Sequence, residues 1–330
     1  TWAMETLEAE RRGLCCWKAM ARRFRSAPWL PLDRCLPWDR RRWLSRPEPN
    51  GIFSAHDEQE LDPKTEDVHV SLFSLKGRVA LVTGGGRGIG RRIAEGLAAE
   101  GARIVCASRT RWQLDESVAA IVEAGGEAAA IELDMADLGS VEKAAAAGIA
   151  EFGQIDILVN NAGMNIREPI DQVTEDHFDQ IMDVNLKGLY FLSQQVARHM
   201  RTRKGGKIIN IGSLTTGHAL AQVSVYTATK GAVGQLTKIQ AVEFGPDNIQ
   251  VNAICPGFVV TALTEKLWAD DTMREWGEGR VPLGRLATPH DMAGTAAFLA
   301  APASDYVTGQ VIYVDGGFMA GDAWPLPGPK

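Results

Sequence analysis

Two patterns of hydrophobic and polar residues alternate along the chain from Arg78 onward. Short runs rich in β-branched residues, typical of buried strands, are followed by longer stretches in which apolar residues recur every three or four positions, as on one face of a helix. This alternation is typical of βαβ units, which build a parallel sheet with helices on both faces. The strands are predicted at Val79–Val82, Arg103–Ala107, Ala128–Leu133, Ile155–Val159, Lys207–Ile211, Ile249–Ile254 and Gln310–Val314. The helices are predicted near Gly88–Glu100, Trp112–Ala124, Leu138–Phe152, Glu175–Met200, Tyr226–Phe244 and Pro289–Leu299.

Seven such strands predict a single α/β domain with one Rossmann-like, doubly wound, seven-stranded parallel sheet. One long stretch, Thr261–Ala287, lacks clear periodicity. Because it follows the carboxyl end of a strand, where open α/β sheets bind ligands, we expect a mobile lid there rather than a domain linker. Its large apolar side chains are expected partly to line the mouth of the site and partly to pack against the domain. They are Leu263, Leu267, Trp268, Met273 and Trp276.

The beginning of the chain differs in composition from the rest. Residues 1–50 hold eleven Lys and Arg against six Asp and Glu, together with five of the nine Trp and three of the five Cys. An Arg-rich targeting peptide is one interpretation, but Glu5, Glu8 and Glu10 lie where such peptides avoid acidic residues. We therefore expect residues 1–74 to be a poorly ordered extension, and residues 75–330 to be the domain that binds cofactor and substrate.

Charge and cysteine content narrow the class of partner. The formal net charge of −6 offers no broad basic field for nucleic acid or an anionic membrane, so a small molecule is the expected partner. No apolar run approaches the eighteen residues of a membrane-spanning helix. The five cysteines lack paired spacing, and no His, Cys and carboxylate cluster has metal-ligand spacing. We therefore predict no disulfide framework, no metal, and a location in the reducing cytoplasm.

A glycine-rich turn joins the first predicted strand to the first predicted helix. Thr83 is followed by Gly84-Gly85-Gly86-Arg87-Gly88-Ile89-Gly90, which reads Thr-Gly-x-x-x-Gly-x-Gly and does not fit Gly-x-Gly-x-x-Gly in any register. Glycines let the backbone approach a pyrophosphate, and the free N–H groups of the following helix can bind it. The loop therefore predicts a dinucleotide site, although a glycine-rich turn alone is a weak signal. Its expected cofactor contacts are Gly84, Arg87, Gly88, Ile89 and Gly90.

The end of the second strand indicates which dinucleotide binds. An acidic residue there would bind the ribose 2′-hydroxyl of NAD(H), but this strand ends in Ser108-Arg109. A serine hydroxyl and a guanidinium suit a 2′-phosphate, and Arg87 adds a second cation. NADP(H) is therefore favoured, with NAD(H) as the alternative. Asp134 is placed for the adenine amino group, or else it caps the helix that starts near Leu138.

Three residues predict acid and base chemistry. Tyr226 and Lys230 are four apart, so a helix would place them on one face and the ammonium near the phenol. A nearby cation favours the phenolate and would lower the pKa of the tyrosine. Ser213 lies thirteen residues upstream, after a strand, at the edge where open sheets bind ligands. Without Ser213, an exposed helical pair would be the simpler interpretation.

These motifs resemble those of the short-chain dehydrogenase/reductase family. The chain contains, in order, the Thr-Gly-x-x-x-Gly-x-Gly loop, Asn160-Asn161-Ala162-Gly163, Ser213 and the pair Tyr226 and Lys230, and the resemblance covers about Leu75 to Phe318. It implies that Tyr226 exchanges a proton with the substrate oxygen, that Ser213 polarises that oxygen, and that Lys230 also holds the cofactor ribose.

The same resemblance implies further roles. Asn185 matches the family's fourth catalytic position and would hold a water that links Lys230 to solvent, whereas the alternative is an asparagine bonded to backbone within a bent helix. The remaining expected cofactor contacts are Met135, Asn161, Ala162, Gly163, Pro256, Gly257, Val259 and Thr261. Of these, Thr261 could equally cap a helix. A homotetramer is also implied, with the Tyr226 helix packed against its symmetry mate.

Substrate identity is less determined. Met164-Asn165-Ile166-Arg167 is similar to the corresponding stretch of the gluconate 5-dehydrogenase and 2-deoxy-D-gluconate 3-dehydrogenase branch, where Arg167 would clamp the carboxylate of a sugar acid. The alternative is a surface arginine paired with Glu168 or Asp171.

The same motifs are also compatible with other functions. A 3-oxoacyl-(acyl-carrier-protein) reductase shares nearly all of them but needs a basic docking surface, for which the candidates are Arg198, Arg201, Arg203 and Lys204, if these are not simply solvated. A general ketone reductase is a further alternative. A non-catalytic dinucleotide-binding regulator would have lost the catalytic residues, which are all present.

Overall fold

The computed structural model describes residues 71–321, which form a seven-stranded sheet with all strands parallel. The strand order is β3-β2-β1-β4-β5-β6-β7, which confirms the predicted doubly wound architecture. The strands are β1 (Val79–Thr83), β2 (Arg103–Ser108), β3 (Ala128–Glu132), β4 (Ile157–Asn160), β5 (Gly206–Ile211), β6 (Ile249–Pro256) and β7 (Val311–Val314).

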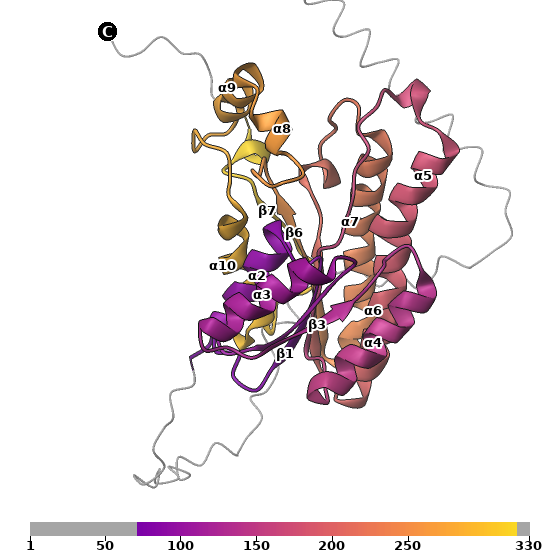
Figure 1. The fold of residues 1–330 in the computed structure, drawn as a ribbon, viewed down its shortest axis with the longest axis vertical. Helices are drawn as coiled ribbons and strands as arrows, with labels where there is room; N and C mark the ends of the chain where they lie inside the picture. Colours follow the sequence, from indigo (N-terminus) through magenta and orange to yellow (C-terminus); the bar gives the residue numbers. More distant parts are fainter. Residues whose placement is uncertain (1–70, 322–330) are drawn as a thin grey trace, which may run out of the picture. The chain divides into compact units, whose positions relative to one another are not determined.

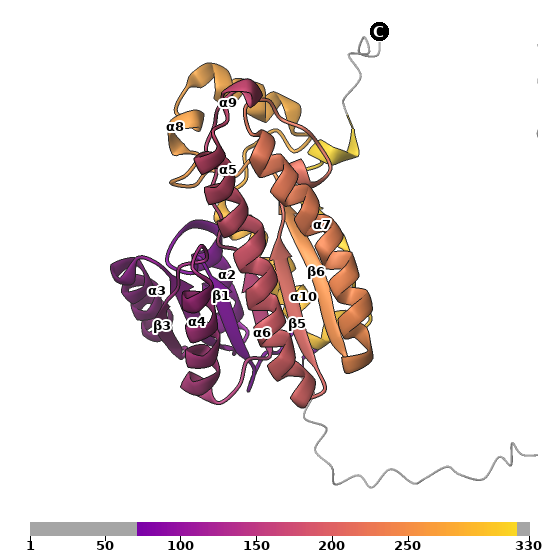
Figure 2. The same cartoon turned by 90° about the vertical axis from the view of Figure 1, so that its right-hand side faces the viewer.

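Helices cover both faces of the sheet (Figure 1). One face carries α2 (Gly88–Ala99), α3 (Arg111–Glu123) and α10 (Ala293–Ala300). The other carries α4 (Leu138–Phe152), α6 (Gly188–Thr202) and α7 (Ser224–Phe244), which lie side by side in Figure 2. The two helical layers bury the apolar side chains on both faces of the parallel sheet, which would otherwise be exposed to water.

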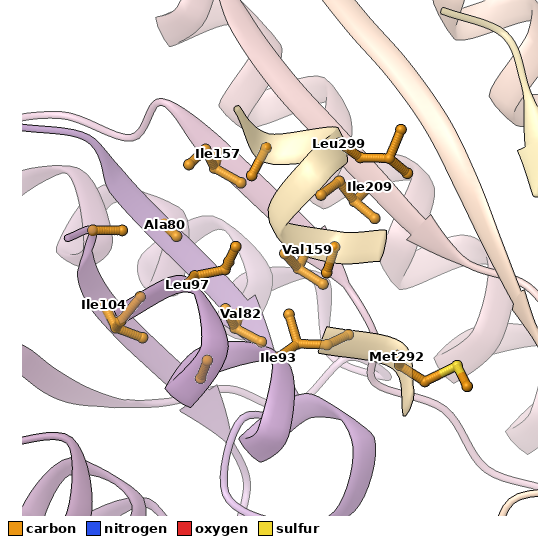
Figure 3. Close-up of a cluster of buried hydrophobic side chains, with 14 of the residues drawn as sticks. Ala80, Val82, Ile93, Leu97, Ile104, Ile157, Val159, Ile209, Met292 and Leu299 are labelled. Atoms are coloured by element: carbon orange, nitrogen blue, oxygen red, sulfur yellow. The ribbon is translucent and has the colours of Figure 1, made fainter. Parts of the chain in front are cut away.

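Each face of the sheet has its own hydrophobic core. In β1, Ala80 and Val82 belong to the core under α2 and α10, whereas Val79 and Leu81 belong to the core under α4, α6 and α7, because successive side chains of a strand point to opposite faces. Ile93 and Leu97, one turn apart on α2, pack with the labelled side chains of the first core in Figure 3. Burying such a side chain fully stabilises the fold by about 1.5–3 kcal/mol.

The strand order places a crevice at the carboxyl end of β1. The chain moves outward from β1 to β2 and β3, then returns to place β4 on the other side of β1. The loops that follow β1 and β4 therefore diverge to opposite faces of the sheet, which is where open α/β sheets bind their ligands.

The structure corrects three of the predicted elements. The single helix predicted over Glu175–Met200 is α5 (Glu175–Met182), a π-helical turn at Asp183–Lys187 and then α6. The last predicted helix is divided into a short turn at Pro289–Met292 and α10. The stretch predicted to be irregular contains α8 (Glu265–Trp268) and α9 (Asp271–Arg280), which lie together at one end of the domain in both views (Figures 1 and 2).

Most of the predicted extension, residues 1–70, lies outside the described residues. The described chain packs on the domain from its beginning, because the Ala303 amide donates to the Leu72 carbonyl at 3.0 Å and the Phe73 ring lies 6.5 Å from that of Phe298. No helix within residues 71–321 is long and apolar enough to cross a membrane. Cys106 and Cys255 are buried free thiols.

Candidate active site

A cavity of about 330 Å³ opens at the carboxyl ends of the strands. Most of the predicted catalytic and cofactor residues line it. They are Gly84, Arg87, Gly88, Ile89, Ser108, Arg109, Asp134, Met135, Asn161, Ala162, Gly163, Ser213, Tyr226, Lys230, Pro256, Gly257, Val259 and Thr261. Three predicted residues do not line it: Gly90, Asn185 and Arg167.

The glycine loop forms one wall through close backbone contacts. Gly84 has a φ of 66°, and a Cβ there would meet the Asn161 side-chain nitrogen at 2.6 Å. A Cβ on Gly90 would clash with the Gly84 carbonyl, so Gly90 acts by letting α2 pack against the turn rather than by lining the cavity. Arg87 at the start of α2 makes no side-chain capping bond. The first N–H groups of α2 are therefore left for an anion.

Thr83 ties the glycine loop to the turn after β4. Its hydroxyl accepts hydrogen bonds from the amides of Asn161 at 2.9 Å and Ala162 at 3.0 Å, and donates to the Val159 carbonyl at 3.2 Å. The Asn161 side chain in turn donates to the Thr83 carbonyl at 2.9 Å. The Thr of the first motif and the Asn of the second therefore hold the two turns in one geometry.

Two arginine side chains give part of the cavity wall a positive charge. Arg87 and Arg109 are exposed, line the cavity and form no ion pair with any residue in the range 71–321. Ser108 lies beside them and accepts from the Thr110 amide at 3.4 Å. Asp134 does not cap α4, since Asp137 does so by accepting from the Gly139 amide at 2.9 Å. The capping alternative for Asp134 is therefore wrong.

The three predicted catalytic residues meet at the ends of β5 and α7. Tyr226 and Lys230 lie one turn apart on α7, and the Lys230 Nζ is 5.6 Å from the centre of the Tyr226 ring. The buried ammonium donates to the carbonyl of Ile211, the last residue of β5, at 2.7 Å. Ser213 follows two residues later and faces the same cavity.

Burial dominates the electrostatics of this cluster. It raises the pKa of the Tyr226 phenol, and a hydrogen bond with the Ser213 side chain lowers it in part. Burial also lowers the pKa of the Lys230 ammonium from 10.5 to about 8. The expected lowering of the Tyr226 pKa is therefore not found, because the cost of burying a phenolate exceeds the gain from its neighbours.

Two residues behind the cluster were missed by sequence reasoning. The Thr216 hydroxyl accepts from the Ser213 amide at 3.2 Å and donates to the Lys230 carbonyl at 3.1 Å. Cys255 lies beside it, and burial raises the pKa of its thiol, which bonds to Thr216. The spacing of Ser213 and Thr216 is that of a capping box, which is the signal that identifies Thr216. Nothing in the sequence pattern indicates Cys255.

Other cavity residues also escaped prediction as site residues, because no recognised role marks them in the sequence. They are Gly86, Ala107, Thr110, Gln113, Leu133, Met164, Val184, Ile211, Gly212, Ala262 and Thr264.

Asn185 lies in the π-helical turn and is completely buried. Its side-chain oxygen accepts from the Met164 amide at 2.8 Å, and its nitrogen donates to the Met164 carbonyl at 2.9 Å and to the Thr229 hydroxyl at 3.3 Å. The two bonds to the Met164 backbone are those expected if Asn185 is an asparagine bonded to backbone within a bent helix. They fix the loop that follows Gly163 against α7, close to Lys230.

Arg167 is exposed, is not among the residues that line the cavity, and forms no ion pair with Glu168 or Asp171. Glu168 instead lies 3.0 Å from His177 Nδ1, and its amide donates to the Gln222 carbonyl at 2.9 Å. The segment with Arg167 is thereby joined to the loop that leads into Tyr226. The guanidinium is free of these carboxylates.

The side chains of the predicted lid divide as expected between the cavity and the domain. Leu263 lines the cavity and is 60% exposed, whereas Trp268 is 2% exposed and packs edge to face on Phe258 with the ring centres 5.3 Å apart. Leu267 and Met273 pack against the same buried cluster. Trp276 is partly exposed beside Phe258.

The basic residues considered for carrier docking lie at the far end of α6. Arg201 pairs with Asp247 at 2.6 Å, Arg203 pairs with Asp156 at 3.2 Å, and Arg198 bonds to neighbouring glutamines. Lys204, like Arg198, has no charged partner within the described chain. They precede β5, so they lie at the edge of the sheet opposite the cavity. Within residues 71–321, no group of three His, Cys, Asp or Glu is placed to hold a metal ion.

The chain is similar to known dehydrogenases over about three quarters of its length. A family model described as enoyl-(acyl carrier protein) reductase matches residues 84–319. The chain is 41% identical over 249 residues to gluconate 5-dehydrogenase of Gluconobacter oxydans, covering 76% of this chain and 97% of the relative. It is 44% identical over 248 residues to 2-dehydro-3-deoxy-D-gluconate 5-dehydrogenase of Bacillus subtilis, covering 75% and 97%. The crystal structure of a gluconate 5-dehydrogenase from Burkholderia cenocepacia in complex with NADP and tartrate has a TM-score of 0.73 and 41% identity, covering 76% of this chain and 98% of that one.

Proposed function

Because the chain belongs to the short-chain dehydrogenase/reductase family, we propose that it is an NADP(H)-dependent oxidoreductase that interconverts a secondary alcohol and a ketone on a sugar acid such as gluconate. The observation that carries this proposal is the meeting of Ser213, Tyr226 and Lys230 in the cavity that the glycine loop lines.

The bound nicotinamide would supply or accept the hydride. The Tyr226 hydroxyl would exchange the proton with the substrate oxygen, and the Ser213 hydroxyl would hold that oxygen in place. Lys230 lies against the Tyr226 ring and would favour the phenolate when the proton leaves. Asn185 and Met164 hold the adjoining loop, which supports a positioning role for Asn185 beside the water-holding role that its family position implies.

The substitution Tyr226→Phe tests the catalytic assignment. It removes the exchangeable proton and keeps the ring, so turnover should fall by about 10²–10⁴-fold. Cofactor affinity, measured by fluorescence titration with NADPH, should stay close to that of the wild type. Near-normal turnover would remove Tyr226 from the mechanism.

Two free guanidinium groups support NADP(H) as the cofactor. Arg87, Ser108 and Arg109 all line the cavity, and a 2′-phosphate matches this donor set. The Burkholderia cenocepacia relative was crystallised with NADP. The double substitution Ser108→Asp with Arg109→Ala should move the preference toward NAD(H). An unchanged ratio of kcat/KM for the two cofactors would contradict this assignment.

Arg167 is proposed as the clamp for the substrate carboxylate. Its support is its exposure in a segment joined to the loop that leads into α7, and its freedom from the neighbouring carboxylates. Of the two relatives described above, one is named for gluconate and the other for 2-dehydro-3-deoxy-D-gluconate. Arg167→Gln should raise KM by about ten- to a hundredfold with little change in kcat. Arg198→Gln is the matched control, because Arg198 bonds only to surface glutamines.

The direct test is oxidation of D-gluconate, followed at 340 nm with NADP and NAD in parallel. Turnover with NADP supports both the clamp and the phosphate site. If neither cofactor supports turnover, the reductase class remains and the substrate becomes a β-ketoacyl group or another ketone. The carrier-protein alternative is weakened by the ion pairs of Arg201 and Arg203 and by their place at the opposite edge of the sheet.

We further propose a homotetramer located in the cytoplasm. Its support is a set of apolar side chains left exposed on α6 and α7, since Tyr190, Ile239 and Val242 are 45%, 48% and 72% exposed. Light scattering after size exclusion should give four times the chain mass. Val242→Arg should lower that mass, and an unchanged mass would place the contacts elsewhere.

A further inference from the structure

A second cavity lies at the edge of the sheet opposite the candidate active site. Its volume is about 170 Å³, and it forms where β1, β4, β5 and β6 begin. It shares no lining residue with the first cavity. Its charged lining residues are Arg78, Asp156, Arg203, Lys204, Lys207 and Asp305.

The four cations of this second cavity face only two carboxylates, and the more buried carboxylate is already fully used. Asp156 is 3% exposed. One of its oxygens accepts from the Val79 amide at 2.9 Å and from Gln154 at 2.7 Å. The other lies 3.2 Å from Arg203 and 3.8 Å from Arg78. Asp156 therefore has no oxygen left for a further cation.

The other carboxylate also has its partner. Asp305 lies 2.8 Å from the Lys207 ammonium, which also donates to the Ser304 hydroxyl at 3.2 Å. Lys204 is exposed and has no ion-pair partner within residues 71–321. The Asn248 carbonyl and side-chain oxygen both accept from the Gln250 side chain, at 3.3 and 2.9 Å. The ammonium of Lys204 is thus a donor that no carboxylate of the described residues neutralises.

Burial, together with neighbouring cations, lowers the pKa of two titratable groups around this cavity. The pKa of Lys207 is lowered by burial and by the charge of Arg78, against the opposing effect of Asp305. The pKa of His199 is lowered by burial and by Arg203. An anion bound among these cations would relieve both repulsions. Lys204 itself has a φ of 56°, a conformation that favours glycine.

We propose that this second cavity binds a phosphate group, as free phosphate or as part of a small phosphorylated molecule. A tetrahedral oxyanion supplies several acceptors to the donors of Lys204, Arg78 and Arg203, and charge-assisted hydrogen bonds of this kind are the strong ones. The site is separate from catalysis, so it would act on the stability of the fold and on the arrangement of the strand beginnings.

The test is titration of the full chain with inorganic phosphate at constant ionic strength, followed by calorimetry. Saturating NADPH is added first, so that phosphate does not report on the glycine loop and its arginines. The wild type should bind one equivalent. Lys204→Gln should weaken this binding by about ten- to a hundredfold. Lys204→Gly, which suits the local backbone, should do the same, and circular dichroism checks that both variants fold.

Lys143→Gln is the matched control, because Lys143 is an exposed lysine on α4 without an ion pair among the described residues. Its phosphate affinity should equal that of the wild type. A wild type without saturable phosphate binding, or equal affinities in the Lys204 and Lys143 variants, would overturn the proposal. A phosphorylated sugar that binds more tightly than phosphate would identify the phosphorylated molecule as the source of the group.

Discussion

Thr216 joins the two segments that carry the catalytic side chains. Its single hydroxyl bonds to the Ser213 amide and to the Lys230 carbonyl. Its methyl group fits where Gly234 has no Cβ, since a Cβ there would lie 2.6 Å from it. The distance between the loop after β5 and α7 therefore depends on one residue that does not line the cavity.

Substitutions at Thr216 should separate this positioning from packing. Thr216→Val keeps the shape and loses both hydrogen bonds, so we expect kcat to fall by about tenfold. Thr216→Ser keeps both bonds and should stay close to the wild type in kcat and in its pH profile. Steady-state kinetics on both variants checks this. Equal kcat in the valine and serine variants would show that the hydroxyl does not matter.

Lys230 makes the stability of the fold depend on pH. Its pKa is about 8 in the folded chain against 10.5 for the ordinary group. Between these values the unfolded chain holds the proton and the folded chain does not, so the free energy of unfolding rises with pH in this window. Relative to Lys230→Met, the wild type should gain roughly 3 kcal/mol from pH 8 to 10.5. Urea unfolding at several pH values measures this difference, and a difference that stays constant contradicts it.

At the scale of elements, the π-helical turn between α5 and α6 determines the direction in which Asn185 points. Apolar residues at helical spacing predicted one helix, but the turn at Asp183–Lys187 rotates the chain so that Asn185 points inward to Met164 and Thr229. Periodicity cannot reveal this turn, because one extra residue in a turn leaves the apolar pattern nearly unchanged on both sides. The hydrogen bonds that stabilise this turn are made with Met164 and Thr229, which belong to other parts of the chain.

A capping box starts the turn that leads into α10. Asp291 accepts from the Thr288 amide at 2.7 Å and from Arg285 at 2.9 and 2.7 Å, and the Arg285 hydrogen bond is the main cause that holds the pKa of this carboxyl well below its usual range. Asp291→Asn should lower the free energy of unfolding by about 1 kcal/mol at pH 7.

This difference should have a definite pH dependence. A carboxyl with a lowered pKa stabilises the fold above its unfolded pKa of 3.8, and the effect is lost as the pH falls toward the lower folded value. The two proteins should therefore converge in acid. Asp179→Asn, on the exposed side of α5, is the control and should show little difference at any pH. A gap that does not shrink as the pH falls below 3.8 would assign the loss to packing.

At the scale of the whole molecule, the sheet separates two sites with different chemistry. Its carboxyl edge carries the glycine loop, Ser213 and Tyr226, and its amino edge carries the cationic cavity around Lys204. A parallel sheet produces this division because all its strands begin at one edge and end at the other.

Residues 1–70 are expected to be dispensable for catalysis. Every residue placed in the candidate active site lies within residues 71–321. A chain that begins at Ser71 should keep the kcat/KM of the full chain within about twofold, since surface changes away from a site have small effects. Purification of both forms and parallel assays measure this. Loss of folding in the shorter chain would show that the domain needs the preceding residues.

The sequence alone determined the architecture and most of the cofactor cavity. Hydrophobic periodicity is local, and the order of strands and helices follows from it with the rule that crossovers are right-handed. The glycine loop, Asn161 and the pair Tyr226 and Lys230 are recognisable because each motif needs particular residues at short spacing.

Tertiary structure alone decided what those residues touch. Cys255 and Thr216 lie behind the catalytic cluster, Glu168 turns to His177 and leaves Arg167 free, and two of the predicted docking arginines pair with acidic residues. These contacts join residues between 9 and 47 positions apart in the chain, and sequence spacing of that kind carries no information on their distance in space. Burial likewise exists only in the folded chain, which is why it reversed the expected direction for the Tyr226 pKa.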